Sequence, residues 1–441
     1  MGDSSQKLFG TDGVRGRANI DITVDLATRL ARAATDKTAS EPVLIGRDTR
    51  RSGPMIAAAL HAGFNSVGVD TVDLGIIPVG GVSRLVRTVG ARYGVMVSAS
   101  HNPAPDNGIK FFGRDGAKLG DSEERAIEHR YFSDTPPVAV AGAGVGFQTT
   151  MADAVDRYVD YIKNGIAYSL RGLEFVLDTA HGAAFQAAPR LFRSLGAAGE
   201  VIGDQPTGMN INDGCGATHP EALTGIVNGR VGFSFDGDAD RLIAIDEDGG
   251  VVDGDVILAI FAKHLADKGK LKNNVVVTTV MANLGFKRAM ADLGIDVIET
   301  DVGDRAVLEA MRSSKAIVGG EQSGHVILED RSTGDGLRTA LRLSEVMAST
   351  GQRLVELRAV MRSYPQVLMN VTVESKSGWE ANPAISAAIT RATDALGNDG
   401  RILVRASGTE PLIRVMVEAG RETTANQIAS SVADVVAAEL S

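Results

Sequence analysis

The chain has 441 residues, of which 44% are hydrophobic and 23% are charged, a composition typical of a soluble globular protein with several domains. Its net charge of −10 argues against a general nucleic-acid or anionic-membrane surface, because no bulk positive field would attract such a partner. The single cysteine cannot form an internal disulfide, and no signal segment or membrane-spanning apolar run is evident, so we expect a cytoplasmic protein. That cysteine, Cys215, lies in a glycine loop and is expected to be incidental.

The first part of the chain opens with a glycine-rich segment, residues 8–16, in which Arg15 is placed to reach a phosphate or simply to lie in a solvated turn. A helix is expected over 25–34. Next comes a unit of strand, polar turn, helix and strand, with the helix over 54–64 and the second strand over 67–72.

The same order of elements returns twice, which predicts separate α/β domains with parallel strands. The second copy has strands over 173–178 and 200–202 around a helix over 184–195, and the third has strands over 274–279 and 295–300. The last part predicts an α+β domain, with strands over 367–373, 401–404 and 412–418 and helices over 383–396 and 426–439. We therefore expect three α/β domains with mixed sheets, residues 1–150, 151–252 and 253–365, and a fourth α+β domain, residues 366–441.

A buried strand over 95–97 ends in a loop that presents Ser100, with His101 beside it and Lys110 shortly after. Ligands of α/β proteins meet the chain where buried strands end, so Ser100 is a candidate for a reactive hydroxyl. An ordinary polar loop is the alternative interpretation.

Three aspartates at alternate positions, Asp236, Asp238 and Asp240, follow an aromatic strand and precede Arg241. Crowded carboxylates repel one another unless a cation lies between them, so this turn is a candidate site for Mg²⁺ or Ca²⁺ rather than a plain acidic turn. Three carboxylates leave coordination positions open, which is typical of Mg²⁺ on a phosphorylated group.

Two further loops have ligand-binding chemistry, although each could be a plain loop. Glu321, Ser323 and His325 lie between glycines after an apolar strand over 316–318, and suit a ligand with many hydroxyl groups. The other loop joins two strands of the last domain and forms an anion cradle from guanidinium groups, hydroxyls and a glycine: Arg405, Ser407, Gly408, Thr409 and Arg414.

Five ordered segments, residues 11–16, 98–103, 236–241, 320–325 and 405–411, together make the chain resemble the α-D-phosphohexomutase superfamily over its whole length. The opening segment and the loop with Gln322 are most similar to bacterial members that act on glucosamine phosphates. The resemblance implies four domains around a central cleft.

The resemblance also implies a role for each candidate residue. Ser100 would carry a phosphoryl group, and one phosphate oxygen would bind Mg²⁺, one ion per subunit, together with Asp236, Asp238 and Asp240. Lys110 and Arg15 would lie near the transferring group, with Lys110 serving proton transfer and charge stabilisation and His101 supporting the loop. The residues implied in substrate binding are Arg241, Glu321, Ser323 and His325 near the sugar, and Arg405, Ser407, Gly408, Thr409 and Arg414 on the phosphate that is not reacting.

The implied reaction interconverts glucosamine 6-phosphate and glucosamine 1-phosphate through a bisphosphorylated sugar, with glucosamine or glucose 1,6-bisphosphate as activator, and feeds UDP-N-acetylglucosamine and cell-wall precursor synthesis. Partners would be the small-molecule hexosamine phosphate, with neither nucleic acid nor membrane. A homodimer is an expectation that rests on the resemblance alone. Three alternatives stay open: preference for mannose or glucose phosphates, a phosphatase that uses Asp236 as nucleophile, and a non-catalytic sugar-phosphate sensor.

Overall fold

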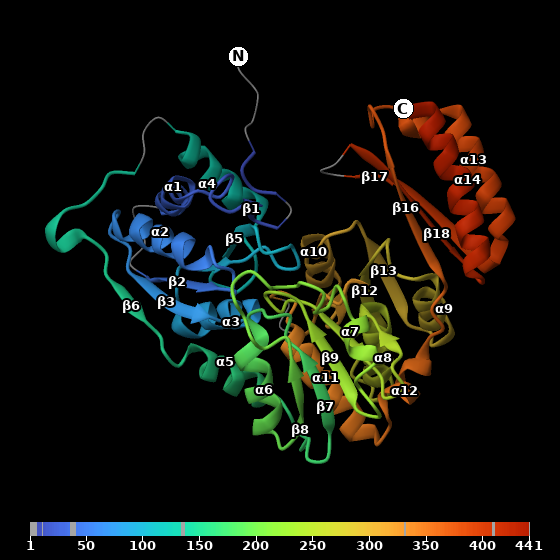
Figure 1. The fold of residues 1–441 in the computed structure, drawn as a ribbon, viewed down its shortest axis with the longest axis horizontal. Helices are drawn as coiled ribbons and strands as arrows, with labels where there is room; N and C mark the ends of the chain where they lie inside the picture. The colour runs from blue at the N-terminus through green and yellow to red at the C-terminus, as the bar shows by residue number, and fades with distance from the viewer. Residues whose placement is uncertain are drawn as a thin grey trace. The chain divides into compact units, whose positions relative to one another are not determined.

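The computed structural model describes residues 7–10, 12–35, 41–133, 137–329, 332–407 and 411–440. The chain divides into two compact units: residues 1–281 with 296–359, and residues 282–295 with 360–441. Within the described residues the strands form four sheets, three of them in the first unit and one in the second (Figure 1). The predicted fold class, mixed α/β sheets followed by an α+β part, is confirmed. The four domain boundaries stay a prediction.

The first sheet has the order β1-β5-β4-β2-β3-β6, in which β2, β3, β4 and β6 are parallel and β1 and β5 are antiparallel to their neighbours. Its strands are β1 (Val14–Arg17), β2 (Val43–Arg47), β3 (Thr71–Ile76), β4 (Tyr93–Val97), β5 (Asp106–Phe112) and β6 (Gln148–Thr150). Four helices accompany it: α1 (Val24–Ala34), α2 (Gly53–Asn65), α3 (Val79–Val89) and α4 (Asp121–Phe132).

Alternation along the strands places helices on both faces of this sheet. Val43 and Ile45 of β2 belong to the core formed with α1 and α2, whereas Gly46 faces Val82 of α3, 2.7 Å from where a Cβ would lie. In Figure 1 α1 and α3 accordingly lie on opposite sides of the strands. The carboxyl ends of β2 and β4 then point to one edge, where the loop with Ser100 begins.

The strand predicted over 67–72 is present, but its bounds are wrong, because β3 begins only at Thr71 and continues to Ile76. Gly68 adopts a φ of +88°, which turns the chain, and the parallel register with β2 starts where Val43 lies opposite Thr71.

The second sheet has the order β11-β10-β9-β7-β8, with β7, β8 and β9 parallel and β10 and β11 antiparallel. Its strands are β7 (Glu174–Asp178), β8 (Ala198–Ile202), β9 (Val231–Phe235), β10 (Leu242–Ile245) and β11 (Val251–Val252), and its helices are α5 (Ala154–Lys163), α6 (Ala184–Ser194) and α7 (Glu221–Thr224). The aspartate turn connects β9 to β10, two strands buried along their whole length.

The third sheet has the order β13-β12-β14-β15. Its strands are β12 (Val275–Thr279), β13 (Asp296–Thr300), β14 (Gly319–Gly320) and β15 (Val326–Ile327), and its helices are α8 (Gly254–Asp267), α10 (Asp304–Ser314), α11 (Gly336–Thr350) and α12 (Leu354–Leu357). The strand predicted over 316–318 is wrong. Ala316 and Val318 are fully buried core residues, but the ladder begins at Gly319, which pairs with Val277 on one side and Ile327 on the other.

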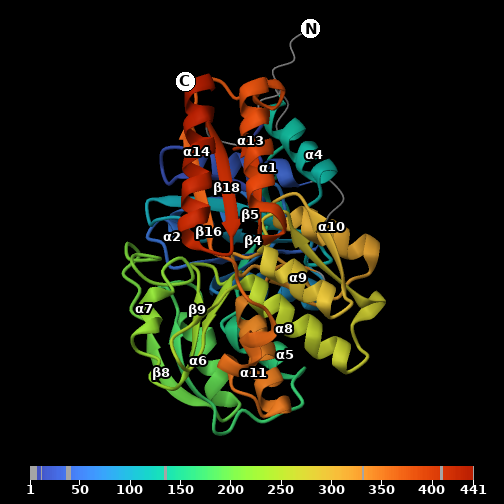
Figure 2. The same ribbon diagram turned by 90° about the vertical axis from the view of Figure 1, so that its right-hand side faces the viewer.

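The second unit contains an antiparallel sheet of order β16-β18-β17, with β16 (Gln366–Thr372), β17 (Gly400–Ala406) and β18 (Leu412–Ala419). Helices α13 (Pro383–Leu396) and α14 (Glu422–Leu440) lie side by side on one face of it (Figures 1 and 2), and α9 (Leu284–Asp292) also belongs to this unit. The predicted order of strand, helix, strand, strand and helix is confirmed.

Short 3-10 turns complete the described helices: Gly142–Gly144, Lys272–Asn274, Arg358–Val360, Trp379–Ala381 and Gly397–Asp399. In the part of the chain that the structure describes, every helix is too short or too polar to cross a membrane.

The packing of α1 on α2 depends on Gly63. A Cβ at this position would lie 2.6 Å from the carbonyl oxygen of Thr28 and 2.7 Å from Cβ of Ala31, so Gly63→Ala should push the two helices apart. We expect a loss of about 1–3 kcal/mol in the free energy of unfolding, measured by denaturant titration. Gly53→Ala in the same helix is the matched control, since its Cβ would lie 3.4 Å from Arg47 and 3.7 Å from the carbonyl oxygen of Asp48, which are ordinary contact distances. Equal stability of the two variants would contradict this account.

His61 gives the first unit a pH-dependent stability. Its Nδ1 lies 2.8 Å from Oγ1 of Thr71, and its buried Nε2 has no hydrogen-bond partner within the described ranges. Burial lowers its pKa below the ordinary 6.5, although Asp73 opposes this shift. Below pH 6.5 the imidazole binds a proton more readily in the unfolded chain than in the folded chain. The free energy of unfolding therefore decreases as the pH is lowered. The unfolding midpoint of His61→Gln should therefore fall less than that of the unmodified chain between pH 7 and pH 5. Parallel profiles would refute the prediction.

Candidate active site

Ser100 lies in the buried loop after β4 and adopts a left-handed backbone conformation with φ of +52°. Its Oγ donates a hydrogen bond to Oδ2 of Asp236 at 2.5 Å, and Nδ1 of His101 lies 3.4 Å from the same oxygen. A non-glycine residue in this conformation costs about 1–2 kcal/mol, so the surrounding contacts must impose it. The fold brings Ser100 and Asp236 into contact although they lie 136 positions apart in the sequence.

The aspartate turn gathers three buried carboxylates, Asp236, Asp238 and Asp240, whose ligand oxygens lie within 4.8 Å of one another. Asp236 Oδ1 accepts a hydrogen bond from the backbone N–H of Arg241 at 3.1 Å, whereas the Oδ1 atoms of Asp238 and Asp240 are buried and have no hydrogen-bond partner among the described residues. Three carboxylates whose oxygens can act as ligands suit a hard divalent cation. The residues therefore fit a Mg²⁺ or Ca²⁺ site.

The pKa shifts of Asp236 and Asp240 also indicate a cation site. Burial, followed by the charges of Asp240 and Asp238, raises the pKa of Asp236 well above its usual range. Burial also acts to raise the pKa of Asp240, but His325, Lys110 and Arg241 outweigh it and hold that pKa well below the usual range. The repulsion on Asp236 is what a bound cation would relieve.

Three neighbouring segments hold the aspartate turn against Ser100. A Cβ on Gly237 would lie 2.5 Å from the carbonyl oxygen of Ser100, so only glycine fits there. The N–H of Val79 donates to the carbonyl of Asp238 at 2.9 Å, and the N–H of Gly336 donates to that of Ala239 at 2.9 Å. Loops of all three sheets of the first unit therefore meet at the turn.

Lys110, on β5, is the buried cation of the site. Its Nζ lies 2.8 Å from Asp238, 3.0 Å from Asp12 and 3.8 Å from Asp240. Burial acts to lower the pKa of this amine, but Asp12 and Asp238 outweigh burial and raise it. A protonated amine stabilises negative charge, so the geometry favours this role of Lys110 over that of a base.

Arg15 and Arg241 bring further positive charge to the same region. Arg15 on β1 lies opposite Gly108 of β5, and the Nε atoms of both arginines are buried with no hydrogen-bond partner in the part of the chain that the structure describes. Burial, then the charges of Arg241 and Arg15, lower the pKa of His101 to about 4, so its imidazole is neutral at pH 7. Guanidinium groups near the Ser100 hydroxyl, with N–H donors still available, suit a phosphate ester on that hydroxyl.

The loop between β14 and β15 carries the three residues predicted to bind a polyhydroxylated ligand. Oε1 of Glu321 accepts from the N–H of Gly303 at 3.1 Å, and the buried Oγ of Ser323 bonds none of the residues that the structure describes. Nδ1 of His325 lies 3.5 Å from Asp240, and its Nε2 accepts from the N–H of Gly334 at 3.1 Å. His325 thus connects this loop to the aspartate turn.

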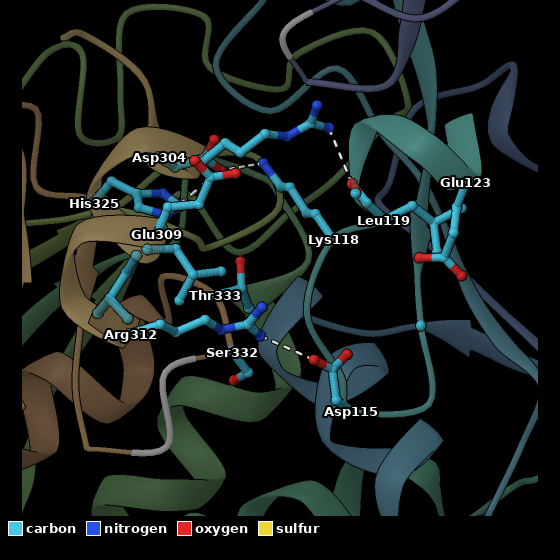
Figure 3. A pocket seen from close by; sticks show the side chains of 15 residues that line it. Asp115, Lys118, Leu119, Glu123, Asp304, Glu309, Arg312, His325, Ser332 and Thr333 are labelled. Atoms are coloured by element: carbon cyan, nitrogen blue, oxygen red, sulfur yellow. Dashed lines mark hydrogen bonds and ion pairs between the residues drawn. The ribbon is translucent and has the colours of Figure 1, made fainter. Parts of the chain in front are cut away.

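Sequence reasoning missed a chain of charges that joins these segments. Lys118 contacts both Asp12 and Asp304, and Asp304 lies 3.8 Å from Nε2 of His325. Figure 3 shows Lys118, Asp304 and His325 facing one another beside a cavity of about 210 Å³. Asp12 lies in the same glycine-rich segment as Arg15, which the sequence singles out. Lys118, however, is 106 positions from Asp12 and 186 positions from Asp304, so no local sequence pattern indicates these contacts.

Arg405, Ser407 and Arg414 lie in the second unit, and Gly408 and Thr409 lie outside the described residues. Arg405 on β17 pairs directly with Arg414 on β18, and burial together with the charge of Arg414 lowers the pKa of Arg405. Two neighbouring guanidinium groups suit an anion, and their role at the site stays a prediction.

Cys215 is buried, and burial together with Asp178 raises the pKa of its thiol to about 12. The thiol is therefore protonated at neutral pH and is no nucleophile, in agreement with the sequence.

Four family models match the chain in order. They describe phosphoglucomutase/phosphomannomutase α/β/α domain I over residues 6–137, domain II over 156–250, domain III over 253–364 and the C-terminal domain over 368–435.

Relatives match along almost the whole chain. Proteins named phosphoglucosamine mutase from Desulforamulus reducens and Arthrobacter are each 48% identical, over 439 and 442 residues, covering 98% of this chain and 99% and 97% of their own lengths. A phosphoglucomutase/phosphomannomutase family protein from Burkholderia thailandensis has a similar fold, with a TM-score of 0.80 at 24% identity over 99% of this chain and 98% of its own. The N-acetylphosphoglucosamine mutase of Aspergillus fumigatus, solved with GlcNAc-6P and magnesium, has a TM-score of 0.71 at 18% identity, covering 100% of this chain and 97% of its own.

Proposed function

Because the chain belongs to the phosphoglucomutase/phosphomannomutase family, we propose that it interconverts glucosamine 6-phosphate and glucosamine 1-phosphate by way of a phosphoserine at Ser100. The relatives named phosphoglucosamine mutase support the choice of sugar. The single observation that carries the choice of reaction is the hydrogen bond of Ser100 Oγ to a buried carboxylate, with Lys110 2.8 Å from the next one.

In the first half of the reaction, the phosphoryl group leaves Oγ of phosphorylated Ser100 and bonds to the O1 hydroxyl oxygen of glucosamine 6-phosphate. The proton of that hydroxyl ends on Oγ of Ser100, passing through the carboxylate of Asp236 that lies 2.5 Å away. The guanidinium groups of Arg15 and Arg241 and the protonated amine of Lys110 bind the phosphoryl oxygens as charge shifts between the two oxygens.

In the second half, the bisphosphorylated sugar presents its 6-phosphate to Ser100. Oγ attacks that phosphorus while Asp236 takes its proton, the bond to O6 breaks, and O6 receives the proton, which leaves glucosamine 1-phosphate and regenerates phosphoserine. The sugar must turn over between the two steps. A fixed anion cradle that includes Arg405 and Arg414 would hold whichever phosphate is not reacting.

Asp236, Asp238 and Asp240, together with an oxygen of the serine phosphate, would hold the divalent cation that their geometry fits. When bound, Mg²⁺ would neutralise charge on the phosphoryl oxygens. The magnesium in the fungal mutase, although seen in a distant relative, agrees with this choice of ion.

Recognition of the sugar would use the loop between β14 and β15. Glu321 would accept from sugar hydroxyls or the amine, and Oγ of Ser323, which has no partner among the described residues, would donate. Preference for mannose or glucose phosphates is the second candidate, because the family includes such enzymes and the phosphoryl-transfer chemistry is common to them. Comparing turnover of the three hexose phosphates decides between them.

The experiment that tests the reaction class is the intact mass of the protein before and after incubation with glucose 1,6-bisphosphate, the proposed activator. We expect a gain of one phosphoryl group, mapped to Ser100 by peptide sequencing. A phosphatase would instead release phosphate with no stable label on Ser100, and a sugar-phosphate sensor would bind without turnover. A cytoplasmic location, partners limited to the hexosamine phosphate, and a homodimer belong to the same proposal.

A further inference from the structure

We propose that Arg50 and Asp48 are positioning residues for phosphoryl transfer: Arg50 holds the carbonyl of Ser100 directly and Asp48 holds its backbone N–H through the hydroxyl of Ser98, which fixes the direction of Oγ. The inference rests on the proposed role of Ser100 as the phosphoryl carrier. Both residues lie in the turn between β2 and α2, a segment that the sequence marks only as polar. Neither contacts the metal-binding carboxylates by hydrogen bond in the described contacts.

Arg50 is fully buried, and all five of its guanidinium N–H donors have acceptors. Nε donates to Oδ2 of Asp48 at 2.9 Å. The other four donors bond carbonyl oxygens of residues 100–106, the loop that carries Ser100. The acceptors are the carbonyls of Ser100 at 2.9 Å, Asn102 at 2.7 Å, Pro103 at 2.5 Å and Asp106 at 3.1 Å. A single side chain therefore fixes the loop at four points along seven residues.

Asp48 anchors the backbone N–H of Ser100 through the hydroxyl group of Ser98. Its Oδ2 accepts from Oγ of Ser98 at 2.6 Å, and that hydroxyl oxygen accepts from the N–H of Ser100 at 2.9 Å. Oδ1 of Asp48 accepts from the N–H of Arg50 at 2.8 Å, so the carboxylate and the guanidinium orient each other. The two peptide groups that flank the Cα of Ser100 are thus both anchored to one buried ion pair.

This anchoring explains how Ser100 keeps its left-handed backbone. With both flanking peptides fixed, the Cα–Cβ bond points toward Asp236, and a rotation of either peptide would swing Oγ away. Nδ2 of Asn212 adds a second donor to the Ser100 carbonyl at 2.9 Å, but it does not reach the amide side. Lysine could not replace Arg50, since an ammonium has three donors and no planar fork.

The test compares Arg50→Lys and Ser98→Ala with the unmodified chain, using the full-length protein loaded with Mg²⁺. The single-turnover rate of Ser100 phosphorylation by glucose 1,6-bisphosphate is measured by quenched-flow and intact mass, together with kcat, KM and the thermal midpoint. We expect Arg50→Lys to slow phosphorylation by about 10²-fold, because misplacement of the nucleophile by about 1 Å has that effect, with KM changed less than about threefold. Ser98→Ala leaves Arg50 in place and should slow it by about tenfold.

Arg230→Lys is the matched control, since Arg230 also donates to two backbone carbonyls, of Val227 and Ile226, and to the carboxylate of Glu200. It should leave the phosphorylation rate unchanged. If Arg50→Lys folds and transfers at the normal rate, the inference is overturned. If that variant does not fold, Ser98→Ala decides: a slowed transfer with normal KM supports the inference, and a normal rate overturns it. Failure of the unmodified chain to phosphorylate at Ser100 would instead overturn the proposed function.

Discussion

Ser100→Ala is expected to lower mutase turnover by at least about 10³-fold. The variant lacks the oxygen that carries the phosphoryl group between sugar molecules, and neighbouring groups cannot replace a covalent carrier. The hydroxyl removed is also the donor to Asp236, but an alanine at φ of +52° keeps the loop's backbone contacts, so the fold should persist. A coupled assay of glucosamine 1-phosphate formation, started with the bisphosphate, measures the loss.

Ser194→Ala is the control for this experiment, because Oγ of Ser194 in α6 bonds only the carbonyl of Leu191 within its own helix among the described contacts. Its turnover should equal that of the unmodified chain. Retained activity in Ser100→Ala would refute the phosphoserine mechanism. Loss of isomerisation with continued release of inorganic phosphate would identify Asp236 as the nucleophile of a phosphatase.

The parts of the site that sequence predicts are those whose chemistry is concentrated locally. Asp236, Asp238 and Asp240 alternate within five residues, so their convergence on one point follows from the turn itself. Ser100 was a candidate because a buried strand ends just before it, and the structure places the end of β4 there. Local polarity thus identifies the groups that act on ligands.

The parts that sequence does not predict are those that depend on distant partners. Arg50 has no local mark that separates it from neighbouring polar turn residues, because its four carbonyl acceptors lie 50 to 56 positions away. The same holds for Lys118 and Asp304, which the fold brings together over 186 positions. Strand ends were mistaken at 67–72 and 316–318 because apolar character predicts burial, whereas a strand also needs a neighbour in register.

Asp236→Asn is expected to have opposite effects on stability with and without metal. Without metal, burial and the charges of Asp240 and Asp238 raise the pKa of Asp236, so at pH 7, above the ordinary pKa of an aspartate, the cost of placing a charge at this position destabilises the folded chain. Asparagine removes that charge and keeps an oxygen able to accept from Ser100. The variant should therefore unfold at a higher temperature than the unmodified chain in a chelator, as measured by calorimetry.

With Mg²⁺ added, the order should reverse, because a ligand that binds only the folded state raises its stability by RT ln(1 + [L]/Kd), which is larger for the chain with the lower Kd. Replacing one of three carboxylates should raise the Mg²⁺ concentration needed for half-maximal activity at least about tenfold and lower turnover at saturation about 10²-fold. Asp267→Asn, which removes an equal charge from an exposed pair with Lys263, should do neither. A thermal midpoint of Asp236→Asn that rises with Mg²⁺ as steeply as that of the unmodified chain would mean that this carboxylate is no metal ligand. Its raised pKa would then reflect burial and repulsion alone, with no cation needed to offset them.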